Sequence, residues 1–155
     1  MPEKSVTAVA RPLREQYEKG LAALQRQNLD YAVAIFVQVL QKEPGFYACR
    51  EALRATQAKK TGGKSGFLKR MFGTASSSPL LAKGQIALRA NPVEAINIAE
   101  QLLNSDPNNL AAHKLLADAA LAADLPRTAA LSLEIAFKLS PDREIAFMAM
   151  QRHRA

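Results

Sequence analysis

The residue types that most often carry chemistry are few in this chain, and they form no reactive group. The 155 residues include one cysteine, Cys49, and two histidines, His113 and His153. None of the three has a neighbour at the spacing that metal sites use. No serine, cysteine or carboxylate pair lies in a known catalytic motif. The sequence therefore predicts a protein that is not an enzyme and has neither a metal ion nor a cofactor.

One glycine-rich stretch, residues 62–66, resembles a phosphate-binding loop in its Gly-Gly-Lys-Ser-Gly order. That motif requires a further glycine five residues before its Gly-Lys-Ser, where this chain has Ala58. It also requires a preceding strand, and the sequence predicts none. We interpret residues 62–66 as part of a linker and not as a nucleotide site.

Basic side chains are concentrated in the middle of the chain. The net charge is +7, and residues 52–93 contain eight basic residues and no acidic one. Within this stretch, Phe67, Leu68, Met71 and Phe72 share one face of a possible short helix. An uneven charge of this kind concerns partners and solubility, not the fold.

Two interpretations of the basic segment remain open. Apolar anchors among lysines suit a helix that lies on an anionic membrane surface. A solvated loop whose apolar residues tuck into the helical body explains the same pattern, and we favour it. Nucleic acid is not an expected partner, because no nucleic-acid motif accompanies the charge. The candidate residues for an anionic surface are Lys59, Lys60, Lys64, Phe67, Lys69, Arg70 and Phe72.

The elements that would position these groups are predicted to be helices. Alanine and leucine dominate, and apolar residues recur at helical spacing in successive segments. The clearest pattern lies in residues 110–141, where two alanine-rich helical runs flank a polar break. Asp124 is the expected N-cap of the second run, and Pro126 suits its first turn. The predicted helices cover residues 11–26, 31–42 (with Asp30 as its cap), 46–60, 80–90, 93–104, 110–123 and 126–139.

The helical pairs repeat along the chain. Asp106-Pro107 closes one pair, and Ser140-Pro141 closes the next, 34 residues later. Residues 110–141 resemble a tetratricopeptide repeat (TPR), a family built from helical pairs with this period. The matching residues are Ala117, Ala129, Leu133, Ala136 and Pro141.

The resemblance implies an all-α fold, a right-handed superhelical solenoid of about four helix pairs. One pair is degenerate, and a terminal helix follows. The expected organisation is a flexible lead over residues 1–10, a first repeat with the first helix of a degenerate second over 11–60, a basic Gly/Ser-rich linker over 61–78, two repeats over 79–141 and a C-terminal helix over 142–155.

The resemblance also implies a function, because the first helices of TPR units line a concave face that binds a peptide. The chain lacks the lysine and asparagine clamp with which some members hold a peptide carboxylate. Arg89, Lys114 and the basic segment favour an acidic protein or peptide as the partner. The implied groove residues are Tyr17, Leu21, Leu24, Leu81, Gln85, Leu88, Arg89, Lys114, Asp118 and Leu121.

A third interpretation concerns the end of the chain. Residues 145–150 are apolar nearly all round, which is unusual for a capping helix and suggests self-association. The first residues contain no long apolar run typical of a signal peptide, and no run is long enough to cross a membrane. These features favour a cytoplasmic protein.

Overall fold

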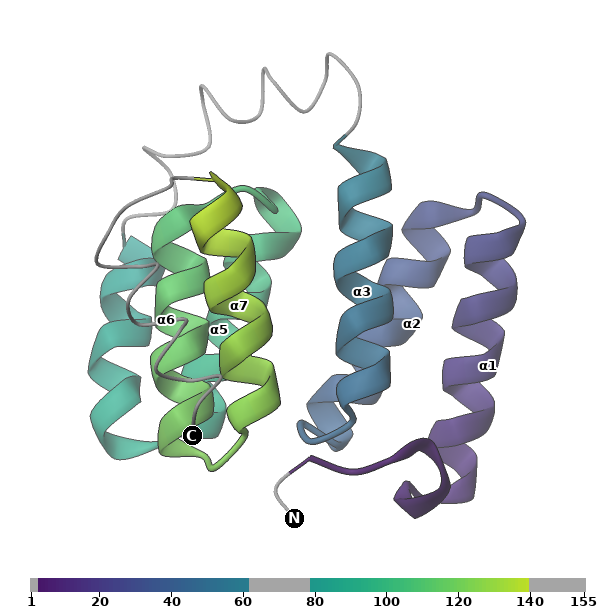
Figure 1. The fold of residues 1–155 in the computed structure, drawn as a ribbon, viewed down its shortest axis with the longest axis horizontal. Coiled ribbons are helices and arrows are strands. Elements are labelled where there is room, and N and C mark those ends of the chain that lie inside the picture. Colours follow the sequence, from purple (N-terminus) through teal and green to yellow (C-terminus); the bar gives the residue numbers. More distant parts are fainter. Residues whose placement is uncertain (1–2, 62–78, 140–155) are drawn as a thin grey trace. The chain divides into compact units, whose positions relative to one another are not determined.

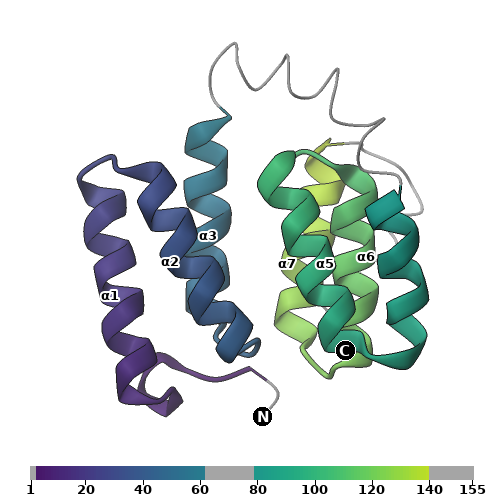
Figure 2. The same ribbon diagram turned by 180° about the vertical axis from the view of Figure 1, so that it is seen from behind.

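All regular elements that the structure describes are helical. The computed structural model describes residues 3–61 and 79–139, and the predicted C-terminal helix and most of the predicted linker lie outside these ranges. Seven α-helices occupy the described residues (Figures 1 and 2). They are α1 (Arg11–Gln25), α2 (Leu29–Lys42), α3 (Tyr47–Lys60), a helix over residues 79–90, α5 (Pro92–Ser105), α6 (Leu110–Ala122) and α7 (Pro126–Leu139).

The all-α prediction is confirmed, and each helix that was predicted within the described residues is present, with ends within two residues of those expected. The helices belong to two compact units, Met1–Phe67 and Leu68–Ala155. Within each unit, helices that follow one another along the chain pack together and run antiparallel. Unit 1 contains α1, α2 and α3. Unit 2 contains helix 79–90, α5, α6 and α7.

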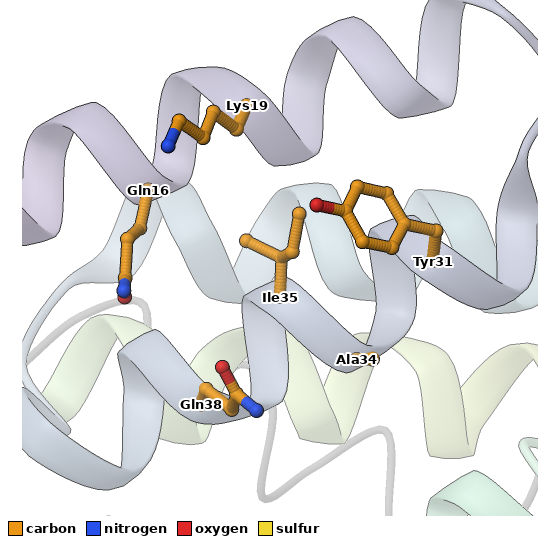
Figure 3. Close-up of a pocket in the computed structure, with 6 residues that line it drawn as sticks. All are labelled: Gln16, Lys19, Tyr31, Ala34, Ile35 and Gln38. Carbon is orange, nitrogen blue, oxygen red and sulfur yellow. The ribbon is translucent and has the colours of Figure 1, made fainter.

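The core of unit 1 is built around the buried Phe36 ring of α2. The Tyr17 ring of α1 lies 6.1 Å from the Phe36 ring and 4.8 Å from the Phe46 ring, between ring centroids. Gly20 faces Phe36 so closely that any larger residue would overlap the ring. This glycine therefore sets the close approach of α1 to α2. On another side the same two helices leave a small groove (Figure 3).

The turn between α1 and α2 has the geometry of a Schellman motif. Gln27 has a positive φ of 64°. Its N–H donates to the Leu24 carbonyl, and the N–H of Asn28 donates to the Ala23 carbonyl. These two bonds satisfy carbonyls that the helix end leaves open. Asn28 occupies the N-cap position of α2, so the expected capping role of Asp30 is wrong.

The turn between α6 and α7 repeats this geometry. Asp124 has a φ of 62°, its N–H donates to the Leu121 carbonyl, and the N–H of Leu125 donates to the Ala120 carbonyl. The expectation that Asp124 caps α7 is therefore wrong, because Asp124 instead closes the end of α6. Asparagine and aspartate tolerate the left-handed region better than most residues, which suits Asp124 to this position.

Residues 3–10, within the predicted N-terminal lead, lie against the helices of unit 1. A short 3₁₀ helix, η1 (Val6–Ala8), precedes α1, and Val9 is buried in the core of unit 1. The N–H of Lys4 donates to the carbonyl of Gly45, 2.7 Å away. The valines of this segment thus contribute apolar surface to the core.

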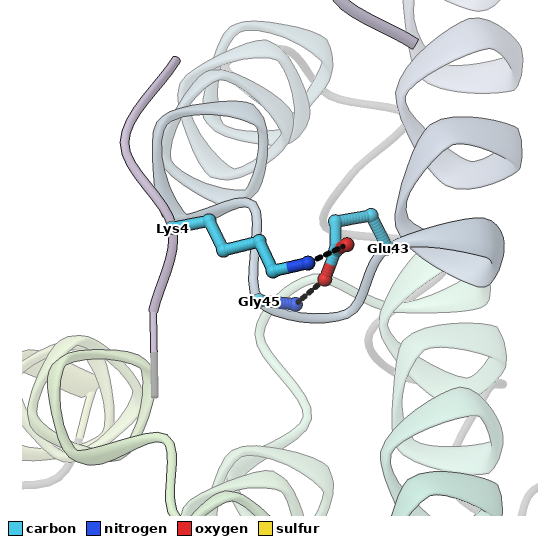
Figure 4. Close-up of polar contacts among 3 residues, drawn as sticks. All are labelled: Lys4, Glu43 and Gly45. Atoms are coloured by element: carbon cyan, nitrogen blue, oxygen red, sulfur yellow. Dashed lines mark hydrogen bonds and ion pairs between the residues drawn. The ribbon is translucent and has the colours of Figure 1, made fainter. Parts of the chain in front are cut away.

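Polar contacts hold the same segment against the turn between α2 and α3 (Figure 4). The Lys4 Nζ atom lies 2.8 Å from Oε2 of Glu43. The other carboxylate oxygen of Glu43 accepts a hydrogen bond of 3.3 Å from the N–H of Gly45. One carboxylate thus joins the N-terminal segment to the turn. An exposed pair of this kind contributes up to about 1 kcal/mol.

The core of unit 2 is formed by alanine, leucine and isoleucine side chains of its four helices. Gly84 of helix 79–90 faces two neighbours at once. A Cβ atom at this position would lie 2.5 Å from Cδ2 of Leu115 and 3.0 Å from Cγ2 of Ile98. Helix 79–90 therefore touches both α6 and α5, and Gly84 permits that closeness.

Side-chain caps begin two helices of unit 2. Asn91 accepts a hydrogen bond from the N–H of Glu94 at the start of α5, and Asn109 accepts one from Ala112 at the start of α6. Pro92 and Pro126 occupy first-turn positions, where a missing N–H has little cost. Local sequence thus fixes where these helices begin.

Candidate functional site

The predicted groove residues lie at matching positions on the helices of unit 2. Leu81 and Lys114 are 33 residues apart, and so are Gln85 and Asp118. Helix 79–90 and α6 are in direct contact at Gly84, so the two sets belong to neighbouring helices. This surface, which we name the unit 2 face, contains Leu81, Gln85, Leu88, Arg89, Lys114, Asp118 and Leu121.

The unit 2 face combines apolar and charged side chains. Leu81, Leu88 and Leu121 are half-buried and pack against the core of unit 2. Gln85, Arg89, Lys114 and Asp118 are exposed. Partly covered leucines beneath exposed polar groups are typical of a surface that binds another chain, since the apolar part supplies affinity and the polar part selects the partner.

One residue of this surface was missed by the sequence analysis. Ile86 is 75% exposed, more than any other large apolar residue described. Together with Gln85, Leu88 and Arg89 it lines a shallow depression on helix 79–90. The helical period could have revealed it, because residue 86 falls on the side opposite Gly84, where a polar residue is the norm.

The charge of helix 79–90 has one sign. Its only ionisable side chains are Lys83 and Arg89, both exposed. On α6, Lys114 adds a positive and Asp118 a negative charge to the unit 2 face. The net charge at the depression is therefore positive, and a positive surface attracts acidic groups on a partner.

The groove residues predicted on α1 have a mainly structural position. Tyr17, Leu21 and Leu24 are half-buried and pack against the core of unit 1. Burial raises the pKa of the Tyr17 phenol above its ordinary value, and the nearby Cys49 and Glu51 groups add to this effect. Tyr17 is therefore a neutral aromatic group at physiological pH. The unit 2 face is the better candidate for binding.

The residues that could have carried other chemistry are internal. His113 is 1% exposed, and its Nε2–H donates to the carbonyl of Pro107 at 2.8 Å. Cys49 is buried, and its thiol lies 3.5 Å from the Phe36 carbonyl. Both side chains therefore pack inside the helical body. Among residues 3–61 and 79–139, no group of three or more potential ligand side chains could hold a metal ion.

The anionic-surface candidates fall mostly outside the described residues. Lys59 and Lys60 are exposed at the end of α3, and Lys60 forms an ion pair with Asp30. Within the described parts of the chain, no helix combines the length and apolar character needed to span a bilayer. The other candidates lie outside the described residues; they are Lys64, Phe67, Lys69, Arg70 and Phe72. His153 and the apolar residues 145–150 also lie outside them.

Comparison of the sequence with models of known protein families finds no match. Comparison with curated proteins finds no significant similarity either. The case for a function therefore rests on the residues themselves.

Proposed function

We propose that this chain is a non-catalytic, TPR-like interaction module that binds a segment of a partner protein on the unit 2 face. The observation that carries the proposal is Ile86, a fully helical isoleucine that stays largely in solvent. An exposed apolar residue bordered by polar ones marks an interaction site when it belongs to a larger patch. Here Leu88 lines the same depression as Ile86 and extends the patch.

The repeated geometry of the chain supports the TPR-like part of the proposal. The turns at Gln27 and Asp124 have the same hydrogen bonds and the same positive φ. Small residues occur where helices approach most closely, at Gly20, Gly84 and the buried Ala117. Similar turns and similar close contacts are what repeated helical pairs require.

The chemistry of the unit 2 face defines the partner segment. Covering Ile86 with apolar atoms would supply about 1.5–3 kcal/mol, a magnitude typical of a central contact residue. Arg89, which lines the same depression, would pair with an acidic side chain beside the apolar anchor. We therefore expect an amphipathic segment with at least one large apolar residue and nearby aspartate or glutamate.

A photo-crosslinking experiment tests the proposal. A photoreactive phenylalanine derivative replaces Ile86 in the full chain, and the captured peptides are identified by mass spectrometry. The matched control carries the same group at Ala22, an exposed position on α1 that does not belong to the unit 2 face. We expect capture of one acidic, apolar segment from position 86 alone.

A second measurement connects this capture to affinity. Ile86→Glu should weaken binding of the captured segment by about tenfold or more, because it removes the apolar contact and places a carboxylate where acidic groups are expected. Ala22→Glu adds the same charge at an exposed position of α1, outside the unit 2 face, and should leave binding unchanged. Equal capture from both positions, or equal binding by both glutamate variants, would contradict the proposal.

A further inference from the structure

A second surface lies in unit 1, in the groove between α1 and α2 (Figure 3). Figure 3 shows Ile35 between Tyr31 and Gln16, with Lys19 on α1 and Gln38 further along α2. The groove encloses about 200 Å³. Its lining residues are Gln16, Lys19, Tyr31, Ala34, Ile35 and Gln38.

One lining group lacks a hydrogen-bond partner. The Oε1 atom of Gln16 is shielded from solvent and accepts no hydrogen bond in the structure. A buried acceptor left unsatisfied costs about 1–3 kcal/mol, and native proteins rarely retain one. A donor in the groove would recover this energy once a rotation of the Gln16 side chain turned Oε1 toward the groove. The N–H of a peptide bond is such a donor.

The apolar side chains of the groove are only partly covered by the rest of the protein. Tyr31 is 54% exposed although it is a large aromatic residue, and Ile35 is only half-buried beside it. A volume of about 200 Å³ is below the roughly 300–1,000 Å³ of most small-molecule sites. It suits one or two amino-acid side chains. Size and exposure therefore favour a polypeptide segment.

Charge narrows the choice of segment. Lys19 is the only charged residue among the six that line the groove, and none of them is acidic. Glu15, an acid on the same helix, lies within 3.1 Å of the Arg11 guanidinium and is paired with it. A carboxylate in the groove would therefore meet a cation and no opposing anion from the lining residues.

We propose that the groove between α1 and α2 binds an extended peptide segment in which an acidic residue neighbours a large apolar one. The apolar side chain would lie on Ile35 and Tyr31, and the carboxylate would pair with Lys19. The carboxamides of Gln16 and Gln38 can each accept from a backbone N–H and donate to a backbone carbonyl. This site is separate from the unit 2 face and does not depend on the function proposed above.

Panning the full chain against a random dodecapeptide library on phage tests this inference. Selected sequences are then synthesised and titrated by fluorescence polarisation. We expect peptides with aspartate or glutamate beside leucine, isoleucine or phenylalanine. Their binding should weaken about tenfold or more in Lys19→Glu and in Tyr31→Ala, and it should be unchanged in Leu88→Glu. Both groove variants change exposed side chains, and circular dichroism melts verify that they fold.

A further variant separates binding from stability. Gln16→Met has nearly the same length and removes the unsatisfied acceptor, so the fold should be as stable as the wild type or more stable. Peptide binding should nevertheless weaken, because the hydrogen bond to the backbone is lost. If Gln16 had a purely structural role, Gln16→Met would be less stable than the wild type and its folded form would bind the peptide with unchanged affinity.

Several outcomes would overturn the inference. The panning could yield no peptide whose binding depends on both Lys19 and Tyr31, or the selected peptides could be basic. Peptides that depend on Leu88 alone would support the unit 2 face and refute the groove. Sedimentation velocity provides the last control, because a dimer that Tyr31→Ala dissociates would identify the occupant as a second copy of the chain.

Discussion

Replacing Gly20 with alanine tests whether close packing, and not helix propensity, decides the stability of unit 1. Alanine favours a helix interior by about 1 kcal/mol over glycine, so propensity alone predicts a gain. The new Cβ would instead overlap the Phe36 ring, at 2.9 Å from Cδ1 and 3.0 Å from Cζ. Phe36 is 0% exposed and contacts other core groups, so the ring has little room to move.

The magnitude follows from the difference between these two effects. Overpacking a tight core costs about 1–3 kcal/mol. The contacts below 3.0 Å indicate the upper part of this range, about 2–3 kcal/mol, so subtracting the propensity gain of about 1 kcal/mol leaves an expected loss of about 1–2 kcal/mol in the free energy of unfolding. The matched control is Ala22→Gly on the exposed side of α1, where only propensity changes and a loss of about 1 kcal/mol is expected.

The chain offers a selective probe for this measurement. It has no tryptophan and three tyrosines, Tyr17, Tyr31 and Tyr47, all of them in unit 1. Urea unfolding followed by tyrosine fluorescence therefore reports on unit 1 alone. The midpoint should fall in Gly20→Ala with the slope unchanged.

A double mutant completes the test. Phe36→Leu removes part of the ring that the new methyl group would overlap, so the two changes together should cost less than the sum of the single changes. The reasoning fails if Gly20→Ala is as stable as the wild type or more stable, or if the two changes are simply additive.

Two further predictions concern single residues of unit 1. Gln27→Gly should stabilise unit 1 by up to about 1 kcal/mol in the same assay, because a non-glycine residue is strained at a positive φ; Gln27→Val should destabilise it. Since burial raises the pKa of Tyr17 above 10.0, the folded state holds this proton more tightly than the unfolded state. The contribution of Tyr17 to the free energy of unfolding is therefore complete below pH 10 and decreases as the pH rises above 10. Tyr17→Phe should reduce this decrease when unfolding is followed by circular dichroism at several pH values above 10.

Much of the fold could be predicted from the sequence because the helical signals are local. Apolar residues at helical spacing defined every described helix, and prolines such as Pro92 and Pro126 marked first turns. The roles of His113 and Cys49 as packing residues also followed from the lack of any neighbouring ligand. Short-range patterns of this kind depend little on the rest of the structure.

The errors arose where tertiary contacts outweigh local preference. Asp124 has the residue type of an N-cap, yet it closes the preceding helix with a positive φ. Asp30 also looked like a cap, but α2 begins two residues earlier. Lys4 and Val9 belong to a segment that is polar in sequence and becomes ordered only through the turn at Gly45. A sequence alone does not reveal such distant partners.

Only part of the candidate site could be predicted from the sequence. The family resemblance implied Gln85, Leu88 and Arg89 as groove residues, and the structure brings them together around one depression. Ile86 was missed because the family resemblance directs attention to the groove positions and not to their neighbours. The groove beside Gln16 depends on how α1 and α2 pack, which no spacing rule specifies.

The packing of helices in chain order has a consequence for how the protein is made. Contacts form mainly between consecutive helices, so the loops that must close are short. Proteins with such local topology fold in roughly microseconds to milliseconds, much faster than the addition of about 5–20 residues per second during synthesis. The first helical hairpin is therefore expected to close while the ribosome is still translating the later helices.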